Sequence, residues 1–136
     1  MKLLVLTSEP VSAEQIRHAL GADADLDKSE AMVVAPALQR SAVRFWMSDS
    51  DDAIEKAQAV GRESRERLES EGVPARADTG EADPYKAVQD ALQTFPADRL
   101  LVFSHPQGAQ LYREEVDHDE LEIRFGLPVD QAELSA

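Results

Sequence analysis

Residues 84–108, PYKAVQDALQTFPADRLLVFSHPQG, join a helix pattern directly to a strand pattern. The apolar side chains of the first half recur at intervals of three and four and therefore share one helical face: Ala87, Val88, Ala91, Leu92 and Phe95. Pro96 ends the helix, and residues 99–103, RLLVF, form the most apolar strand pattern in the chain. A strand without polar alternation is typical of a parallel sheet that is covered on both faces.

The same alternation of strand and helix patterns extends over the rest of the chain. The predicted strands cover residues 2–6, 31–35, 73–78, 99–103 and 127–129. The predicted helices cover residues 13–20, the segment between the capping residues 48–52 and Gly72, residues 84–95 and residues 119–125. The proline and low apolar content of residues 73–78 indicate an edge strand. This order predicts a single α/β domain over residues 1–136, with a mainly parallel sheet and helices on both faces.

Composition excludes several classes of function. The chain has 136 residues and a formal net charge of −13, with 27 acidic and 14 basic residues. Such a surface repels phosphate backbones, so we expect neither nucleic-acid nor anionic-membrane binding. The absence of cysteine excludes disulfides, thiolate zinc sites and a cysteine nucleophile. Because the first apolar run is also too short for a secretory signal, we expect a cytosolic location.

Ligands of parallel α/β sheets bind beyond the carboxyl ends of the strands, which fixes the candidate site. The candidate binding residues follow four predicted strands: Thr7, Ser8, Ala35, Pro36, Gly80, Ser104, His105 and Gly108. A Ser8–His105 pair could join a nucleophile to a base. The sequence offers no assignable orienting carboxylate and no Gly-x-Ser-x-Gly elbow, however, so we predict no catalytic residue.

Two acidic segments contain residue types that can bind metal ions, but we interpret neither as a metal site. Asp49, Asp51 and Asp52 lack the glycine and distal glutamate of a calcium loop and are interpreted as acids in the first turn of a helix. Asp117, His118 and Asp119 are adjacent in sequence, and three adjacent residues do not easily converge on one ion. We therefore predict no metal site.

Residues 71–108, EGVPARADTGEADPYKAVQDALQTFPADRLLVFSHPQG, resemble the universal stress protein family, small domains of the nucleotide-binding HUP group. The shared features are a helix that ends in glycine, a strand that leads into a turn, a helix that ends near Ala-Asp, and a buried strand that exits into a glycine-containing loop. Residues 126–129, GLPV, resemble the closing strand. The resemblance implies a three-layer α/β/α Rossmann-like doubly wound sandwich, with a five-stranded parallel sheet in the order 3-2-1-4-5. It also implies a homodimer formed through the last strand.

The sequence departs from the ATP-binding branch of this family at two places. That branch carries an aspartate just after the first strand, where this chain has Thr7, Ser8 and Glu9. It also carries several glycines after the fourth strand. There this chain has only Gly108, followed by residues 109–120, a segment rich in glutamate and aspartate. Acidic groups repel phosphates. We therefore predict no cofactor, with ATP or another adenine nucleotide as the alternative.

The resulting prediction is a small cytosolic regulatory or stress-response domain with a degenerate nucleotide-binding rim. Two alternatives stay open at this point. One is a nucleotide-binding domain of the ATP or AMP type with weak hydrolase activity. The other is an acidic protein-interaction module without a ligand.

Overall fold

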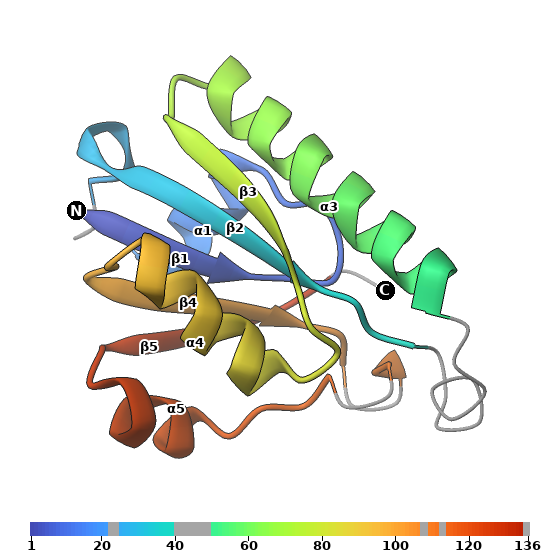
Figure 1. The fold of residues 1–136 in the computed structure, drawn as a ribbon. Helices are drawn as coiled ribbons and strands as arrows, with labels where there is room; N and C mark the ends of the chain where they lie inside the picture. The colour runs from blue at the N-terminus through green and yellow to red at the C-terminus, as the bar shows by residue number, and fades with distance from the viewer. Residues whose placement is uncertain (22–24, 40–49, 107–108, 112–113, 135–136) are drawn as a thin grey trace.

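The computed structural model describes residues 1–21, 25–39, 50–106, 109–111 and 114–134. Five strands form one parallel sheet: β1 (Lys2–Leu6), β2 (Glu30–Pro36), β3 (Ala75–Gly80), β4 (Arg99–Ser104) and β5 (Val129–Glu133). The strands lie in the order β3-β2-β1-β4-β5 (Figure 1), which confirms the predicted order and fold class. The order reverses between β1 and β4, at the position where ligands of such sheets bind.

Helices cover both faces of the sheet (Figure 1): α1 (Ala13–Leu20), α3 (Ser50–Ser70), α4 (Pro84–Thr94) and α5 (His118–Phe125). A short 3₁₀ helix, η1 (Leu26–Lys28), precedes β2 and was not predicted. On one face Leu3 and Val5 of β1 share a core cluster with Ile16 of α1 and Leu68 of α3. On the other face the intervening residues of β1 share a cluster with residues of α4 and α5. The period of two along each strand thus feeds two separate cores.

The residues of α1 and α4 explain where these helices begin. The hydroxyl of Ser12 accepts a hydrogen bond from the backbone N–H of Gln15, and the side-chain oxygen of Gln15 accepts one from the backbone N–H of Ser12. This reciprocal pair is a capping box. At α4, the carboxylate of Asp83 accepts from the backbone N–H of Tyr85, and Pro84 occupies the first helical position.

Two strands lie further along the chain than predicted. Val73 donates its backbone N–H to the carbonyl of Leu68, so it closes the end of α3 and β3 begins only at Ala75. Gly72, with a φ of 85°, permits this turn. The strand β5 extends from Val129 to Glu133, beyond the predicted residues 127–129. An edge strand is exposed along one side and carries polar residues there. A pattern of consecutive apolar residues therefore does not predict its full length.

Within the described ranges, none of the helices combines the length with the apolar composition that crossing a bilayer requires.

Candidate functional site

Most of the predicted binding residues meet at the carboxyl ends of β1, β2 and β4, which we call the rim. Ser8, Ala35 and Pro36 line one small cavity, together with Leu38 and Leu111. Thr7, Ser8 and Pro36 line a second cavity, which Glu114 also borders. Each cavity measures about 10 Å³. That volume is close to the minimum for one water molecule, so the described side chains leave little free space in these two cavities.

Gly80 lies at the end of β3, where it pairs in register with Pro36 of β2. A Cβ atom at Gly80 would lie 2.4 Å from the Cβ of Ala87 and 3.2 Å from Cγ1 of Val34. The glycine therefore permits α4 to pack closely on the sheet. This contact gives Gly80 a packing role that the sequence did not suggest.

Ser104 lines neither of the two rim cavities. Ser104 lines a separate hollow that Gln131 and Glu133 of β5 also border. Its backbone carbonyl accepts from the N–H of Leu134, which ties β4 to the chain beyond β5. Gly108 lies outside the described residues.

Thr7 and Ser8 are both buried directly after β1. The hydroxyl of Thr7 donates to the carbonyl of Glu9 at 2.7 Å, and its backbone N–H donates to the carbonyl of Val34. The hydroxyl of Thr7 therefore serves its own turn. The chain then continues to Val11, whose N–H donates to the buried hydroxyl of Ser64 on α3. These bonds fix the exit of β1 from within the fold.

His105 is surrounded by polar side chains at the rim. Its Nδ1 atom lies 2.8 Å from Oε1 of Glu114 and 3.4 Å from the hydroxyl oxygen of Ser8. Its Nε2 atom lies 3.4 Å from Oε1 of Glu9, and Lys56 pairs with the same carboxylate oxygen at 3.2 Å. The structure thus brings together Ser8 and His105, and it adds two carboxylates.

The carboxylate of Glu114 supplies the partner for which the sequence offered no position. The residue is 5% exposed, whereas its neighbour Glu115 is exposed. Besides the imidazole, Glu114 accepts from the backbone N–H of His105 and, at 3.0 Å, from that of Leu111. The sequence placed acidic residues in this segment, but no spacing rule distinguishes Glu114 from Glu115.

The geometry of Ser8, His105 and Glu114 differs from that of a catalytic triad. In a triad the nucleophile and the acid contact opposite nitrogens of the imidazole. Here both Ser8 and Glu114 contact Nδ1. An ionised carboxylate can only accept a hydrogen bond, so Nδ1 donates its N–H to Glu114. The Nδ1 atom is therefore not a base for the Ser8 hydroxyl, and the cluster is better described as a hydrogen-bonded lock.

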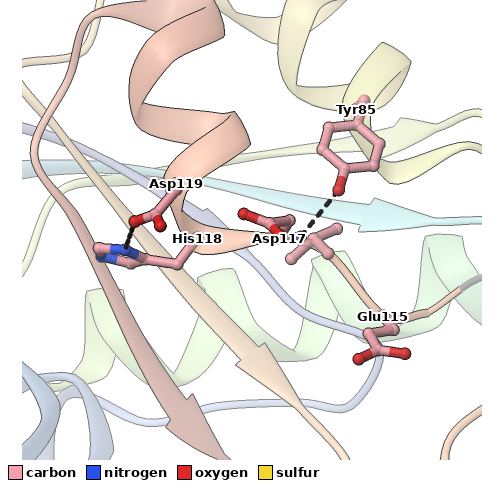
Figure 2. A pocket seen from close by; sticks show the side chains of 6 residues that line it. Tyr85, Glu115, Asp117, His118 and Asp119 are labelled. Atoms are coloured by element: carbon pink, nitrogen blue, oxygen red, sulfur yellow. Dashed lines mark hydrogen bonds and ion pairs between the residues drawn. The ribbon is translucent and has the colours of Figure 1, made fainter.

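A larger hollow lies beside the amino-terminal end of α5 (Figure 2), and we call it the α5 hollow. It measures about 550 Å³ and is lined by Tyr85, Glu115, Val116, Asp117, His118 and Asp119. The hydroxyl of Tyr85 accepts from the backbone N–H of Asp117 at 2.7 Å. Burial raises the pKa of Tyr85, while the bond from Asp117 acts in the opposite direction. The phenol therefore remains protonated at neutral pH.

His118 borders this hollow and makes contacts with both of its ring nitrogens. Nε2 lies 2.6 Å from the carbonyl of Val129 and 3.3 Å from Oε1 of Glu122, and Nδ1 lies 3.4 Å from Oδ1 of Asp119. The bond to the Val129 carbonyl is the main cause that raises the pKa of His118, followed by the bond to Asp119.

The metal-ligating atoms that come together here belong to His118, Asp119 and Glu122, which lie within 4.8 Å of one another. The sequence considered Asp117 in this group. The structure replaces it with Glu122, one helical turn beyond His118, while Asp117 caps α5. The two carboxylates approach opposite nitrogens of one ring, an arrangement that fits a protonated imidazole between two anions.

The strand order and its reversal at the rim define a doubly wound α/β domain. Several solved structures share this fold. The hypothetical protein MJ0577 superposes with a TM-score of 0.60 at 14% identity, over 99% of this chain and 96% of that one. A universal stress protein family protein from Arabidopsis thaliana, At3g01520, with AMP bound, superposes with a TM-score of 0.58 at 15% identity, over 100% and 93%.

The third structure, the hypothetical protein PH0823, superposes with a TM-score of 0.52 at 12% identity, over 99% of this chain and 96% of that one. No protein-family model matches the chain, and the comparison with curated proteins finds no significant match. The chain therefore has the universal stress protein fold, as its sequence resemblance predicts.

Proposed function

We propose that this protein is a regulatory domain of universal stress protein type whose degenerate rim does not hold ATP in the usual way. The observation that carries the proposal is the volume at the rim, where the two cavities measure about 10 Å³ each. Pockets for ligands of nucleotide size measure several hundred Å³, roughly 300 or more. A nucleotide would have to displace Leu38, Leu111 or Glu114.

Charge at the rim supports the same proposal. Glu9 and Glu114 flank His105, and the whole chain has a net charge of −13. A triphosphate placed against these carboxylates would be repelled, and Lys56 already pairs with Glu9. Regulation would then act through contacts with other proteins. We propose that these contacts include a homodimer formed through β5, which lies at an edge of the sheet, and that the domain acts in the cytosol.

The second candidate function is binding of an adenine nucleotide, with weak hydrolysis. The AMP that the Arabidopsis neighbour binds favours it, since that protein shares the fold. An acidic interaction module without any ligand is the third, and the acidic lining of the α5 hollow favours it. The second candidate differs from the other two in predicting that a nucleotide stabilises the folded chain.

A thermal-shift experiment separates the first two candidates. The protein is heated with Mg-ATP, with AMP, and with magnesium chloride alone as the control. A ligand that binds only the folded state raises the Tm. We expect both nucleotides to leave the Tm within experimental error of the control. A rise of several degrees at sub-millimolar nucleotide would overturn the proposal in favour of nucleotide binding.

A further inference from the structure

Two residues that follow β4, His105 and Leu111, contact the carboxylate of Glu114. Their backbones donate two hydrogen bonds to that carboxylate, one from the N–H of His105 to Oε2 and one from the N–H of Leu111 to Oε1 at 3.0 Å. The imidazole of His105 adds a third at 2.8 Å. The side chain of Glu114 is only 4% exposed. Three donors therefore converge on one buried carboxylate.

This arrangement is how proteins hold small oxyanions. Backbone N–H groups of a loop form a concave site for an anion, and a charged acceptor makes each hydrogen bond stronger. A buried carboxylate is stable only when such donors satisfy it. Here the anion belongs to the chain itself. The carbonyl of Leu111 accepts from the N–H of Glu114 at 3.1 Å, and this turn brings the carboxylate back to the N–H of Leu111.

We propose that His105 and Leu111 form an oxyanion-binding cradle whose resident ligand is the carboxylate of Glu114. Any external oxyanion, whether a carboxylate or a phosphate, enters this cradle only by displacing that side chain. The inference deepens the proposed function and rests on it, because it names the group that closes the same rim against phosphates. The ligand class is defined by the chemistry that carboxylates and phosphates share, namely negatively charged oxygens that accept hydrogen bonds.

The charges around the cradle predict what removal of Glu114 does. Glu9 faces Nε2 of His105 and is paired with Lys56, so it does not contact the donors that Glu114 uses. The substitution Glu114→Ala removes one negative charge, leaves the three donors without their acceptor, and opens a space of carboxylate size. The variant therefore loses stability. A small anion supplied from solution restores part of it.

The experiment is a chemical rescue of the full chain. Parent protein, Glu114→Ala and Glu115→Ala are heated in sodium chloride, in sodium formate and in sodium phosphate at equal ionic strength. We expect Glu114→Ala to melt roughly 10 °C below the parent in chloride. Formate and phosphate on the order of 0.1 M recover several degrees of that loss. The parent and Glu115→Ala, whose exposed carboxylate lies next in the sequence, show no selective response to either anion.

A second variant tests whether the opened space matters. Glu114→Gln keeps the length of the side chain and an oxygen acceptor but loses the charge. We expect it to be destabilised less than Glu114→Ala and to show no rescue by formate, because its amide fills the cradle. If Glu114→Ala does not fold in chloride, the comparison is made as refolding yield, and a higher yield in formate than in chloride supports the cradle.

The outcomes separate this inference from the proposed function. Equal responses of Glu114→Ala to chloride, formate and phosphate would overturn the cradle, and so would equal rescue of Glu115→Ala. Stabilisation of the parent protein by ATP would overturn the proposed function, whatever the variants do. Selective rescue by formate and phosphate, with a parent that ignores ATP, supports both. Rescue by formate alone also supports the cradle and limits it to the smaller oxyanion.

Discussion

The rim and the α5 hollow are two concave regions of the molecule. They differ in whether their polar side chains contact one another or border open space. At the rim, Ser8, His105 and Glu114 contact one another, and the two cavities measure about 10 Å³ each. The α5 hollow measures about 550 Å³, and carboxylates of Glu115, Asp117 and Asp119 border it. Folds of this kind bind ligands at the rim, yet the α5 hollow is larger than either of the two rim cavities that the described residues line.

The difference shows that topology determines where a site can form, while side chains determine whether it stays open. The rim lies at the reversal of strand order that nucleotide-binding domains use. Leu38 and Leu111 line a small cavity at that position. The carboxylate of Glu114 accepts hydrogen bonds from the backbone N–H groups that follow β4. The α5 hollow is lined largely by the acidic segment that leads into α5. Substitutions in each region can therefore break or sharpen the contrast.

The largest effect is expected at Gly80, at the end of β3, where α4 packs closely against the sheet. The substitution Gly80→Ala places a Cβ atom 2.4 Å from the Cβ of Ala87. We expect it to lower the free energy of unfolding by about 3 kcal/mol, since α4 must move away from the sheet. Urea unfolding measures the loss, and the amide exchange of residues in α4 shows whether the helix has moved.

Gly72→Ala is the matched control for backbone strain. Gly72 has a φ of 85°, and no atom lies within 4 Å of the position of an added Cβ. The variant should cost about 1 kcal/mol, because only the left-handed backbone opposes it. A cost at Gly80 no greater than the cost at Gly72 would contradict the close approach of α4 to β3.

A smaller effect is expected from Tyr85→Phe in the α5 hollow. The variant removes the hydroxyl that accepts from the N–H of Asp117, at the start of α5. We expect a loss of about 1 kcal/mol in the free energy of unfolding, because the hollow admits water that can replace the acceptor. Amide exchange at Asp117 should accelerate, while the amides of β4 keep their protection. Unchanged exchange at Asp117 would show that the phenol does not hold this segment.

The sequence predicts the fold well because its central strands are apolar runs and its helices carry caps. Leu100 and Leu101 of β4 face opposite cores, so the run RLLVF signals an interior strand without any knowledge of its neighbours. The predictions are weaker where a residue serves two elements. Val73 is as apolar as a strand residue, yet its N–H closes α3.

The candidate site is predicted only in outline. Strand ends can be counted from the sequence, which is why Ser8 and His105 are found together. The partner of His105 depends on a tertiary contact with Glu114, nine residues further along the chain, which sequence spacing does not encode. Ser104 illustrates the same limit, since it borders a different hollow from Ser8. Side-chain direction at a loop follows from tertiary contacts rather than from local pattern.

The smallest effect concerns His118 and the pH dependence of the α5 hollow. Its pKa is raised above the ordinary value of 6.5, first by the bond to the carbonyl of Val129 and then by Asp119. A raised pKa in the folded state means that the protonated form stabilises the fold. This contribution is complete below the unfolded pKa and is lost as the pH rises through the folded pKa.

The substitution His118→Gln should therefore make the free energy of unfolding depend less on pH. We expect the variant to be less stable than the parent below about pH 6 and to approach it above about pH 8.5. The midpoint of the His118 imidazole, measured by NMR in the parent protein, should lie above 6.5. The effect is small because the ring is largely exposed, so water and salt screen its partners. A midpoint below the ordinary value would mean that the Val129 carbonyl does not hold the imidazole in solution, and α5 would then be joined to β5 through Leu121 and its apolar neighbours alone.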